Sequence, residues 1–163
     1  MHTHDVDEEL VAAVAEVART RCRGDNHTMA AAARATDGRI VTGVNTYHFT
    51  GGPCAELVVV GTAAAQGAYG LRTIVAVGDR DRGVVPPCGR CRQALLDYFP
   101  ALEVVVPTPG GGLRAVIGSF GYSSVRNGAA IRLCCASHPA AWEAACCLGE
   151  QGDHGRLGHR TSR

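Results

Sequence analysis

The sequence predicts a layered α/β domain in which helices pack on the faces of a mixed β-sheet. Three observations lead to this prediction. An Asp37-Gly38 pair, a strong hairpin signal, joins two short apolar segments. Beyond the hairpin, helical and strand-like segments alternate along the chain. The chain has 163 residues and 46% hydrophobic content, which is enough for one domain with a substantial core.

The first half of the chain begins with a helix and continues into the hairpin. Residues 7–21 carry apolar side chains at helical spacing, and RATDGRIVTGVN at 34–45 has the pattern of two paired strands. TYHFTGGP at 46–53 is expected to be a loop. The segment 54–70 is long and alanine-rich, and we expect a helix there despite its three consecutive valines.

The second half alternates buried strands with one helix. In chain order we expect a strand at 71–79, a loop at 80–87, a helix at 88–99, a strand at 102–107, a turn at 108–112 and an edge strand at 113–118. The strand–helix–strand unit should contain parallel strands with a right-handed crossover. Helix N-termini then gather at the carboxyl edge of the sheet, where ligands usually bind.

Composition and charge argue against a nucleic-acid-binding or membrane-spanning protein. The net charge is +1 and only 5% of residues are aromatic, so we expect neither a basic surface nor a stacking platform for bases. No apolar stretch approaches the roughly 18 residues of a membrane helix. The acidic start, MHTHDVDEE, lacks the basic region of a secretory signal. We therefore expect a cytoplasmic protein.

The cysteines are the most informative residues. In a chain without a secretory signal, clustered cysteines indicate metal binding or catalysis rather than disulfides. Cys22 is expected to be a free thiol. The two adjacent pairs near the C-terminus are poorly suited to a single tetrahedral ion. The eight positions are Cys22, Cys54, Cys88, Cys91, Cys134, Cys135, Cys146 and Cys147.

Three of these cysteines have the spacing of a catalytic zinc site. Cys88 and Cys91 form a C-x-x-C pair after Pro87, and positions three apart on a helix share one face. Cys54 opens the other helix at the same sheet edge and is the natural third ligand. A catalytic zinc ion keeps its fourth position for water. Taken alone, a C-x-x-C pair is equally compatible with a structural zinc site or a redox pair.

Glu56 adds a group that a structural zinc site would leave unexplained. Residues two apart on a helix point away from each other, so Cys54 and Glu56 face one cavity only if Cys54 lies in the helix cap. The preceding Gly-Gly-Pro favours that placement. A carboxylate beside an activated water can accept its proton and pass it on. We also expect Arg90 or Arg92 to donate a hydrogen bond to a ligand sulfur.

The pattern Cys54-Ala55-Glu56, followed about thirty residues later by Pro87-Cys88-Gly89-Arg90-Cys91, resembles the cytidine deaminase superfamily. The resemblance extends over residues 28–116. It implies a three-layer α/β/α fold, a homotetramer, and one zinc ion per subunit held by Cys54, Cys88 and Cys91. It also implies hydrolysis of a cytosine amine to a uracil carbonyl, with release of ammonia and with Glu56 as the proton carrier.

The same resemblance suggests four residues that contact the substrate. Ordinary cytidine deaminases carry an N-x-E segment that holds the ribose hydroxyls, and here Asn45 is followed by Thr46 and Tyr47 instead. Arg82 matches a substrate-contacting arginine and would suit a carboxylate. Thr28 stands where the family has a substrate-contacting serine. Tyr122 matches a substrate-contacting tyrosine, shifted by a short deletion.

The C-terminal part departs from the family. We expect a deaminase-like domain at 1–128 and a divergent tail at 129–163, peripheral or disordered. A reading-frame change near residue 117 would also explain the tail.

Three functions remain open at this point. DGRIVTGVNTYHFTGGPCAELVVVGTAAA and RGVVPPCGRCRQALLDYFP resemble a branch of the superfamily that deaminates a cytosine nucleoside antibiotic and so confers resistance. The first alternative is a pyrimidine-salvage deaminase that acts on cytidine or deoxycytidine. The second is a zinc-binding module without catalytic activity. The expected partners are a small nucleoside and further copies of the chain, with no nucleic acid and no membrane.

Overall fold

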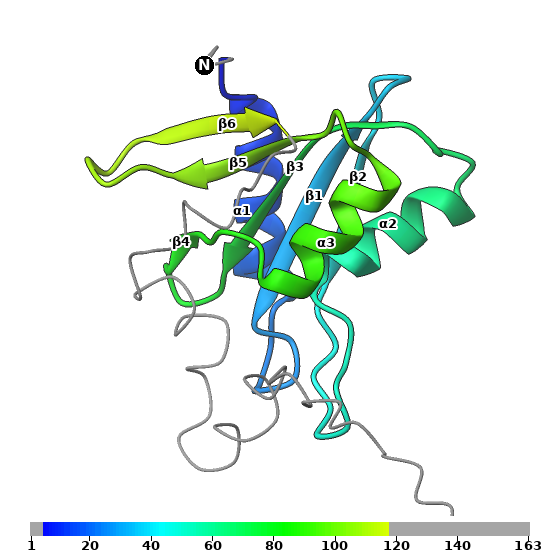
Figure 1. Ribbon diagram of the computed structural model, residues 1–163. Helices are drawn as coiled ribbons and strands as arrows, with labels where there is room; N and C mark the ends of the chain where they lie inside the picture. Colours follow the sequence, from blue (N-terminus) through cyan, green and yellow to red (C-terminus); the bar gives the residue numbers. More distant parts are fainter. Residues whose placement is uncertain (1–4, 118–163) are drawn as a thin grey trace, which may run out of the picture.

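The computed structural model describes residues 5–117, in which helices cover both faces of a central sheet (Figure 1). Helix α1 lies on one face, and α2 and α3 lie on the other. This is the predicted three-layer α/β/α arrangement. Tyr122 and the tail from residue 129 lie outside the described residues. The helices are α1 (Glu8–Arg21), α2 (Ala55–Ala65) and α3 (Gly89–Tyr98), and the strands are β1 (Met29–Ala35), β2 (Ile40–Val44), β3 (Leu71–Gly78), β4 (Gly83–Val84), β5 (Glu103–Pro107) and β6 (Leu113–Ile117).

The sheet is mixed, as the sequence predicts. Its strand order is β2-β1-β3-β5-β6, and β4 pairs with β3 beside this path. Strands β3 and β5 are parallel, with Thr73 opposite Glu103, and all other pairs are antiparallel. Helix α3 lies in the chain between the two parallel strands. The predicted β-α-β unit is therefore confirmed.

Two element boundaries differ from the sequence prediction. Strand β1 begins at Met29, well before the predicted hairpin segment. Its alanines favour a helix intrinsically, but burial between two helical layers selects the strand. Helix α2 ends at Ala65 rather than near residue 70. Gly67, with φ +76°, stops it in a turn where the Ala68 amide donates to the Ala63 carbonyl at 2.8 Å.

The side chains on the two faces of β1 belong to two separate hydrophobic clusters. Ala30 and Ala32 face α1, whereas Ala31, Ala33 and Ala35 belong to the cluster on the α2 side. Small side chains on the strand allow both helical layers to approach the backbone closely. The same holds for β2, because a Cβ on Gly43 would lie only 3.0 Å from Val58 Cγ1 of α2. Within residues 5–117, no helix is long and apolar enough to cross a membrane.

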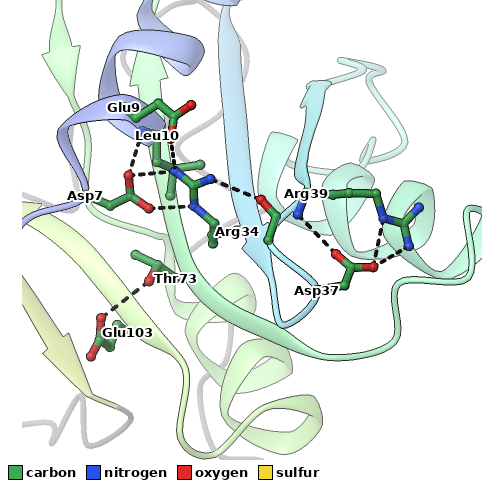
Figure 2. Close-up of polar contacts among 9 residues, drawn as sticks. Asp7, Glu9, Leu10, Arg34, Asp37, Arg39, Thr73 and Glu103 are labelled. Atoms are coloured by element: carbon green, nitrogen blue, oxygen red, sulfur yellow. Dashed lines mark hydrogen bonds and ion pairs between the residues drawn. The ribbon is translucent and has the colours of Figure 1, made fainter.

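Polar contacts fix α1 onto the sheet (Figure 2). The Asp7 carboxylate caps α1 by accepting from the Leu10 amide at 2.9 Å. It also pairs with the Arg34 guanidinium of β1, with Nε–Oδ2 and Nη2–Oδ1 distances of 2.8 and 2.9 Å. Glu9 accepts from the same Arg34 Nη2 at 2.8 Å. One arginine therefore holds the first turn of α1 against the central strands.

Candidate metal centre

The N-termini of α2 and α3 meet at one end of the sheet (Figure 1). Cys54 and Cys88 are the N-cap residues of these helices, each with extended backbone angles, and neither side chain makes a capping hydrogen bond. A proline precedes each of them. Because the cap residue lies outside the regular turns, its side chain can turn away from the helix. Both sulfurs are therefore available to a common ligand.

The three predicted ligand sulfurs form a compact triangle. Cys54 Sγ and Cys88 Sγ lie 3.8 Å apart, and the sulfurs of Cys54, Cys88 and Cys91 are all within 4.8 Å of one another. Zinc–sulfur bonds of about 2.3 Å in a tetrahedron place two sulfurs about 3.8 Å apart. Cys91, in the first turn of α3, is 0% exposed. The geometry and the donor set thus fit one zinc ion with a fourth position left for another ligand.

Electrostatics in the triangle favour a bound cation. The hydrogen bond with Cys88 and burial raise the pKa of the Cys54 thiol to about 11. The pKa of Cys91 is also raised, first by its hydrogen bonds with Cys54 and Cys88 and then by burial. Three thiolates cannot accumulate here without a counter-charge. A divalent metal ion supplies that charge and stabilises the deprotonated ligands.

Arg90 contributes a second positive charge. Its Nη2 donates to the Gly52 carbonyl at 2.7 Å and lies 3.7 Å from Cys54 Sγ. The prediction that Arg90 or Arg92 would reach a ligand sulfur is thus confirmed for Arg90. In the part of the chain that the structure describes, Arg92 makes no such contact. Arg90 partly offsets the negative charge of the thiolates and joins α3 to the loop before α2.

Glu56 lies in the first turn of α2, next to the sulfur triangle. Its side chain is only 6% exposed. Burial raises the pKa of the carboxyl group, and the nearby Cys88 charge adds to the shift. A carboxyl group in this environment exchanges protons more readily near neutral pH than one in water. Its hydrogen bond with Cys91 places it against one of the three clustered sulfurs.

The structure joins Thr28, Asn45 and Arg82 in one hydrogen-bonded network at the same sheet end. Asn45 Oδ1 accepts from the backbone amides of Thr28 and Met29, at 2.7 and 2.8 Å. Arg82 Nη2 donates to the Thr28 carbonyl and to Asp79 Oδ1, the latter at 2.7 Å. The fourth predicted substrate residue, Tyr122, lies outside the described residues.

Two further residues of this network were missed by sequence reasoning. His27 Nδ1 lies 2.7 Å from the Asn45 carbonyl oxygen. Asp79 carries the carboxylate that pairs with Arg82. Asp79 ends the segment predicted as a strand at 71–79, and the loop predicted at 80–87 gave no reason to pair its carboxylate with Arg82. Nothing in the sequence marks His27.

The loop between β2 and α2 is closed tightly beside Cys54. The Thr46 amide donates to the Pro53 carbonyl at 3.1 Å. A Cβ on Gly52 would lie 1.6 Å from the Thr46 carbonyl oxygen, so this position requires glycine. His48 bonds within the loop, to the Thr50 hydroxyl at 2.5 Å. The loop therefore carries Asn45 and Cys54 on one fixed piece of backbone.

The comparison with known families decides the broader identity. A family model described as the cytidine and deoxycytidylate deaminase zinc-binding region matches residues 4–106, more than half of the chain. The chain belongs to the cytidine and deoxycytidylate deaminase family. Members of this family carry a zinc-binding region, and the three clustered cysteines of this chain could bind one zinc ion.

Relatives of this deaminase include enzymes with two different names. It is 32% identical over 120 residues to blasticidin-S deaminase of Bacillus cereus, covering 68% of this chain and 86% of that protein. It is 43% identical over 70 residues to cytidine deaminase of Mycobacterium tuberculosis strain CDC 1551, covering 42% of this chain but only 52% of that protein.

Solved cytidine deaminases share the fold of this deaminase. The enzyme from Burkholderia pseudomallei is 28% identical, with a TM-score of 0.57, and the match covers 70% of this chain and 94% of that one. The enzyme from Mycobacterium leprae is 30% identical, with a TM-score of 0.54, over 68% of this chain and 94% of that one. The three-layer arrangement is thus that of the cytidine deaminases.

Proposed function

We propose that this deaminase hydrolyses the cytosine amine of blasticidin S, producing a uracil ring and ammonia and conferring resistance to the antibiotic. The observation that supports hydrolysis is the buried Glu56 carboxyl group beside the triangle of Cys54, Cys88 and Cys91. A purely structural zinc site needs no buried acid at its open side. An acid in that place is suited to moving protons between water and a cytosine ring.

Each side chain of the centre has a distinct role in this proposal. Cys54, Cys88 and Cys91 hold one zinc ion, which when bound supplies Lewis acidity to the attacking water. Glu56 accepts a proton from that water and delivers protons to the ring nitrogen and the leaving amine. The carboxyl group can carry out both transfers because burial raises its pKa. Arg90 limits the negative charge of the thiolates that would otherwise weaken the metal as a Lewis acid.

Three observations favour blasticidin S over cytidine as the substrate. The match to blasticidin-S deaminase covers 86% of that protein, whereas the match to the tuberculosis cytidine deaminase covers 52%. Tyr47 occupies the place where cytidine deaminases carry the glutamate that holds the ribose. Blasticidin S bears a carboxylate on its sugar ring, and the arginine of the Thr28–Asn45–Arg82 network suits such a group.

A side-by-side assay tests the substrate. The zinc-loaded protein is given blasticidin S and cytidine in parallel, and the loss of cytosine absorbance is followed with each. We expect turnover of the antibiotic, with cytidine slow or inert. Rapid turnover of cytidine alone would favour the salvage function, which the higher local identity to cytidine deaminase supports. If the protein turned over neither blasticidin S nor cytidine, the result would favour a zinc-binding module without catalytic activity.

Substitution of Glu56 tests the mechanism. Glu56→Gln should keep the fold and the zinc ion but lower kcat by about 10²–10⁴-fold, the usual contribution of a general acid/base group. Zinc content by atomic absorption and kcat on the preferred substrate are measured together. Glu103→Gln, a carboxylate on β5, serves as the control and should keep full activity. An active Glu56→Gln enzyme would contradict the assigned role.

The homotetramer that the resemblance implies remains part of this proposal. An apolar groove between α2 and α3 offers an interface for this assembly. Tyr98 at its end is 71% exposed. Burial of such side chains against another copy of the chain would remove apolar surface from water. The groove is lined by Leu57, Val60, Gly61, Ala94 and Tyr98.

A further inference from the structure

The turn between β3 and β4 has an unusual backbone conformation, and this conformation fixes where Arg82 lies. Arg80 and Asp81 have φ values of +51° and +58°, the left-handed conformation of a tight hairpin turn, which Asp tolerates but Arg disfavours. The Arg82 amide closes the turn by donating to the Asp79 carbonyl at 3.2 Å. Strained backbone of this kind persists where surrounding contacts over-determine it, often at functional sites. The turn lies at the sheet end that holds the metal centre (Figure 1).

The Arg82 side chain folds back over the end of β3. A Cβ on Gly78 would lie 2.8 Å from Arg82 Nε, so the glycine leaves the space that the guanidinium occupies. On one edge, Nε donates to the Asp79 carbonyl at 3.3 Å, and Nη2 donates to the Thr28 carbonyl and to Asp79 Oδ1. Among residues 5–117, Nη1 makes no hydrogen bond. The side chains of Arg82 and Asp79 are 25% and 12% exposed.

We propose that Asp79 is a positioning residue that sets how tightly the site binds a substrate with an anionic group. Asp79 and the Thr28 carbonyl hold one edge of the guanidinium, so that Nη1 is left toward the substrate. The carboxylate also neutralises much of the charge of Arg82, which moderates its attraction for an anion. Asp79 thus contributes both geometry and charge balance. The inference rests on the proposed function, because it assumes that Arg82 contacts the substrate.

Two substitutions separate geometry from charge. Asp79→Asn keeps an oxygen that accepts from Nη2 but removes the negative charge. Asp79→Ala removes both. Asp81→Asn is the matched control, because it makes the same change of charge in the same turn on an exposed residue whose side chain, within residues 5–117, makes no hydrogen bond or ion pair with Arg82. All variants are made in the Glu56→Gln background, so that bound substrate is not consumed and binding is measured without turnover.

Isothermal titration of the zinc-loaded variants with blasticidin S and with cytidine tests the proposal. Asp79→Ala should weaken blasticidin S binding about tenfold, as expected when a charged hydrogen-bonding group loses its orientation. Asp79→Asn should bind it at least as tightly as the parent protein, and cytidine affinity and the Asp81→Asn control should not change. Circular dichroism checks that each variant is folded.

The opposite results would overturn the inference. Unchanged blasticidin S binding in folded Asp79→Ala would show that Asp79 does not position Arg82. Equal weakening of both ligands, or equal loss in the Asn and Ala variants, would contradict a geometric role specific to the anionic group. A parent protein that binds neither ligand refutes the inference directly. Failure of turnover with binding intact would instead count against the proposed reaction alone.

Discussion

Helix α1 and the two helices of the metal centre begin in different ways. At α1, the Asp7 side chain caps the helix: it accepts a hydrogen bond from the Leu10 amide, which has no backbone partner within the helix. At α2 and α3, the cap residues are Cys54 and Cys88, whose side chains make no capping bond. Their sulfurs point instead toward each other, 3.8 Å apart.

The difference shows that the metal centre sacrifices two side-chain helix caps and that other interactions stabilise these helix N-termini instead. A thiol is a poor cap, so both helices forgo a stabilising contact of about 1 kcal/mol each. In return, two helix N-termini, which carry partial positive charge, converge on a cluster of thiolates. The metal ion and the helix dipoles together supply the stabilisation that side-chain caps supply at α1. The comparison predicts opposite effects of substitutions at the two kinds of cap.

The largest effect is expected at Cys88. Cys88→Ser creates a better helix cap but removes a zinc ligand. Zinc affinity should fall by more than the roughly 10–100-fold that follows loss of an outer hydrogen-bond partner. The zinc-free variant should in contrast be more stable than the zinc-free parent by about 1 kcal/mol. Competition with a chromogenic chelator measures the first quantity, and urea unfolding in chelator measures the second.

Cys22→Ser is the matched control for this experiment. Cys22 ends α1 rather than beginning a helix, and it is half-buried away from the sulfur triangle. Zinc affinity should be unchanged in this variant. If Cys88→Ser bound zinc as tightly as the parent, the assignment of Cys88 as a ligand would be wrong.

A smaller effect is expected at Asp7. Asp7→Ala removes the cap of α1 and the ion pair with Arg34, and should lower the free energy of unfolding by about 2 kcal/mol. Asp7→Asn can still cap the helix, so it should recover about half of that loss. Urea unfolding of the two variants separates the contributions. Glu16→Gln, which breaks only an exposed pair with Arg19, should leave stability nearly unchanged.

The smallest effect is the acid dependence of the same contact. Hydrogen bonding to Arg34 lowers the pKa of Asp7 below its ordinary value of 3.8. A carboxyl group with a depressed pKa in the folded state stabilises the fold above its unfolded pKa, and the stabilisation is lost as pH falls through the folded value. The stability difference between parent and Asp7→Asn should therefore be constant above about pH 5 and shrink below pH 4. A difference that persists at pH 2 would contradict this contribution.

The sequence was most reliable where its pattern repeated a simple period or a fixed spacing. The Asp37-Gly38 pair located the hairpin because few residue pairs tolerate the positive φ that such turns need, and Gly38 has φ +91°. The spacing of Cys54, Cys88 and Cys91 indicated the zinc centre, because helix geometry and tetrahedral coordination allow few alternatives.

Contacts between segments far apart in the chain could not be predicted from periodicity or spacing. Alanines in β1 have no strand preference, and only burial between α1 and α2 makes that segment a strand. The sequence predicted only a loop after residue 79, yet residues 79–82 form a hairpin turn from which Arg82 donates to the Thr28 carbonyl, 54 positions away in the chain.

The sequence by itself determined that Cys54, Cys88 and Cys91 cluster, that Glu56 lies beside them and that the architecture is mixed α/β, because each depends on local spacing or on the alternation of segments. Tertiary structure alone decided that Asp79 would be the partner of Arg82 and that Asn45 would bind the start of β1. Those contacts depend on the approach of strands and turns in space. Packing of the whole domain sets that approach, and no short stretch of residues encodes it.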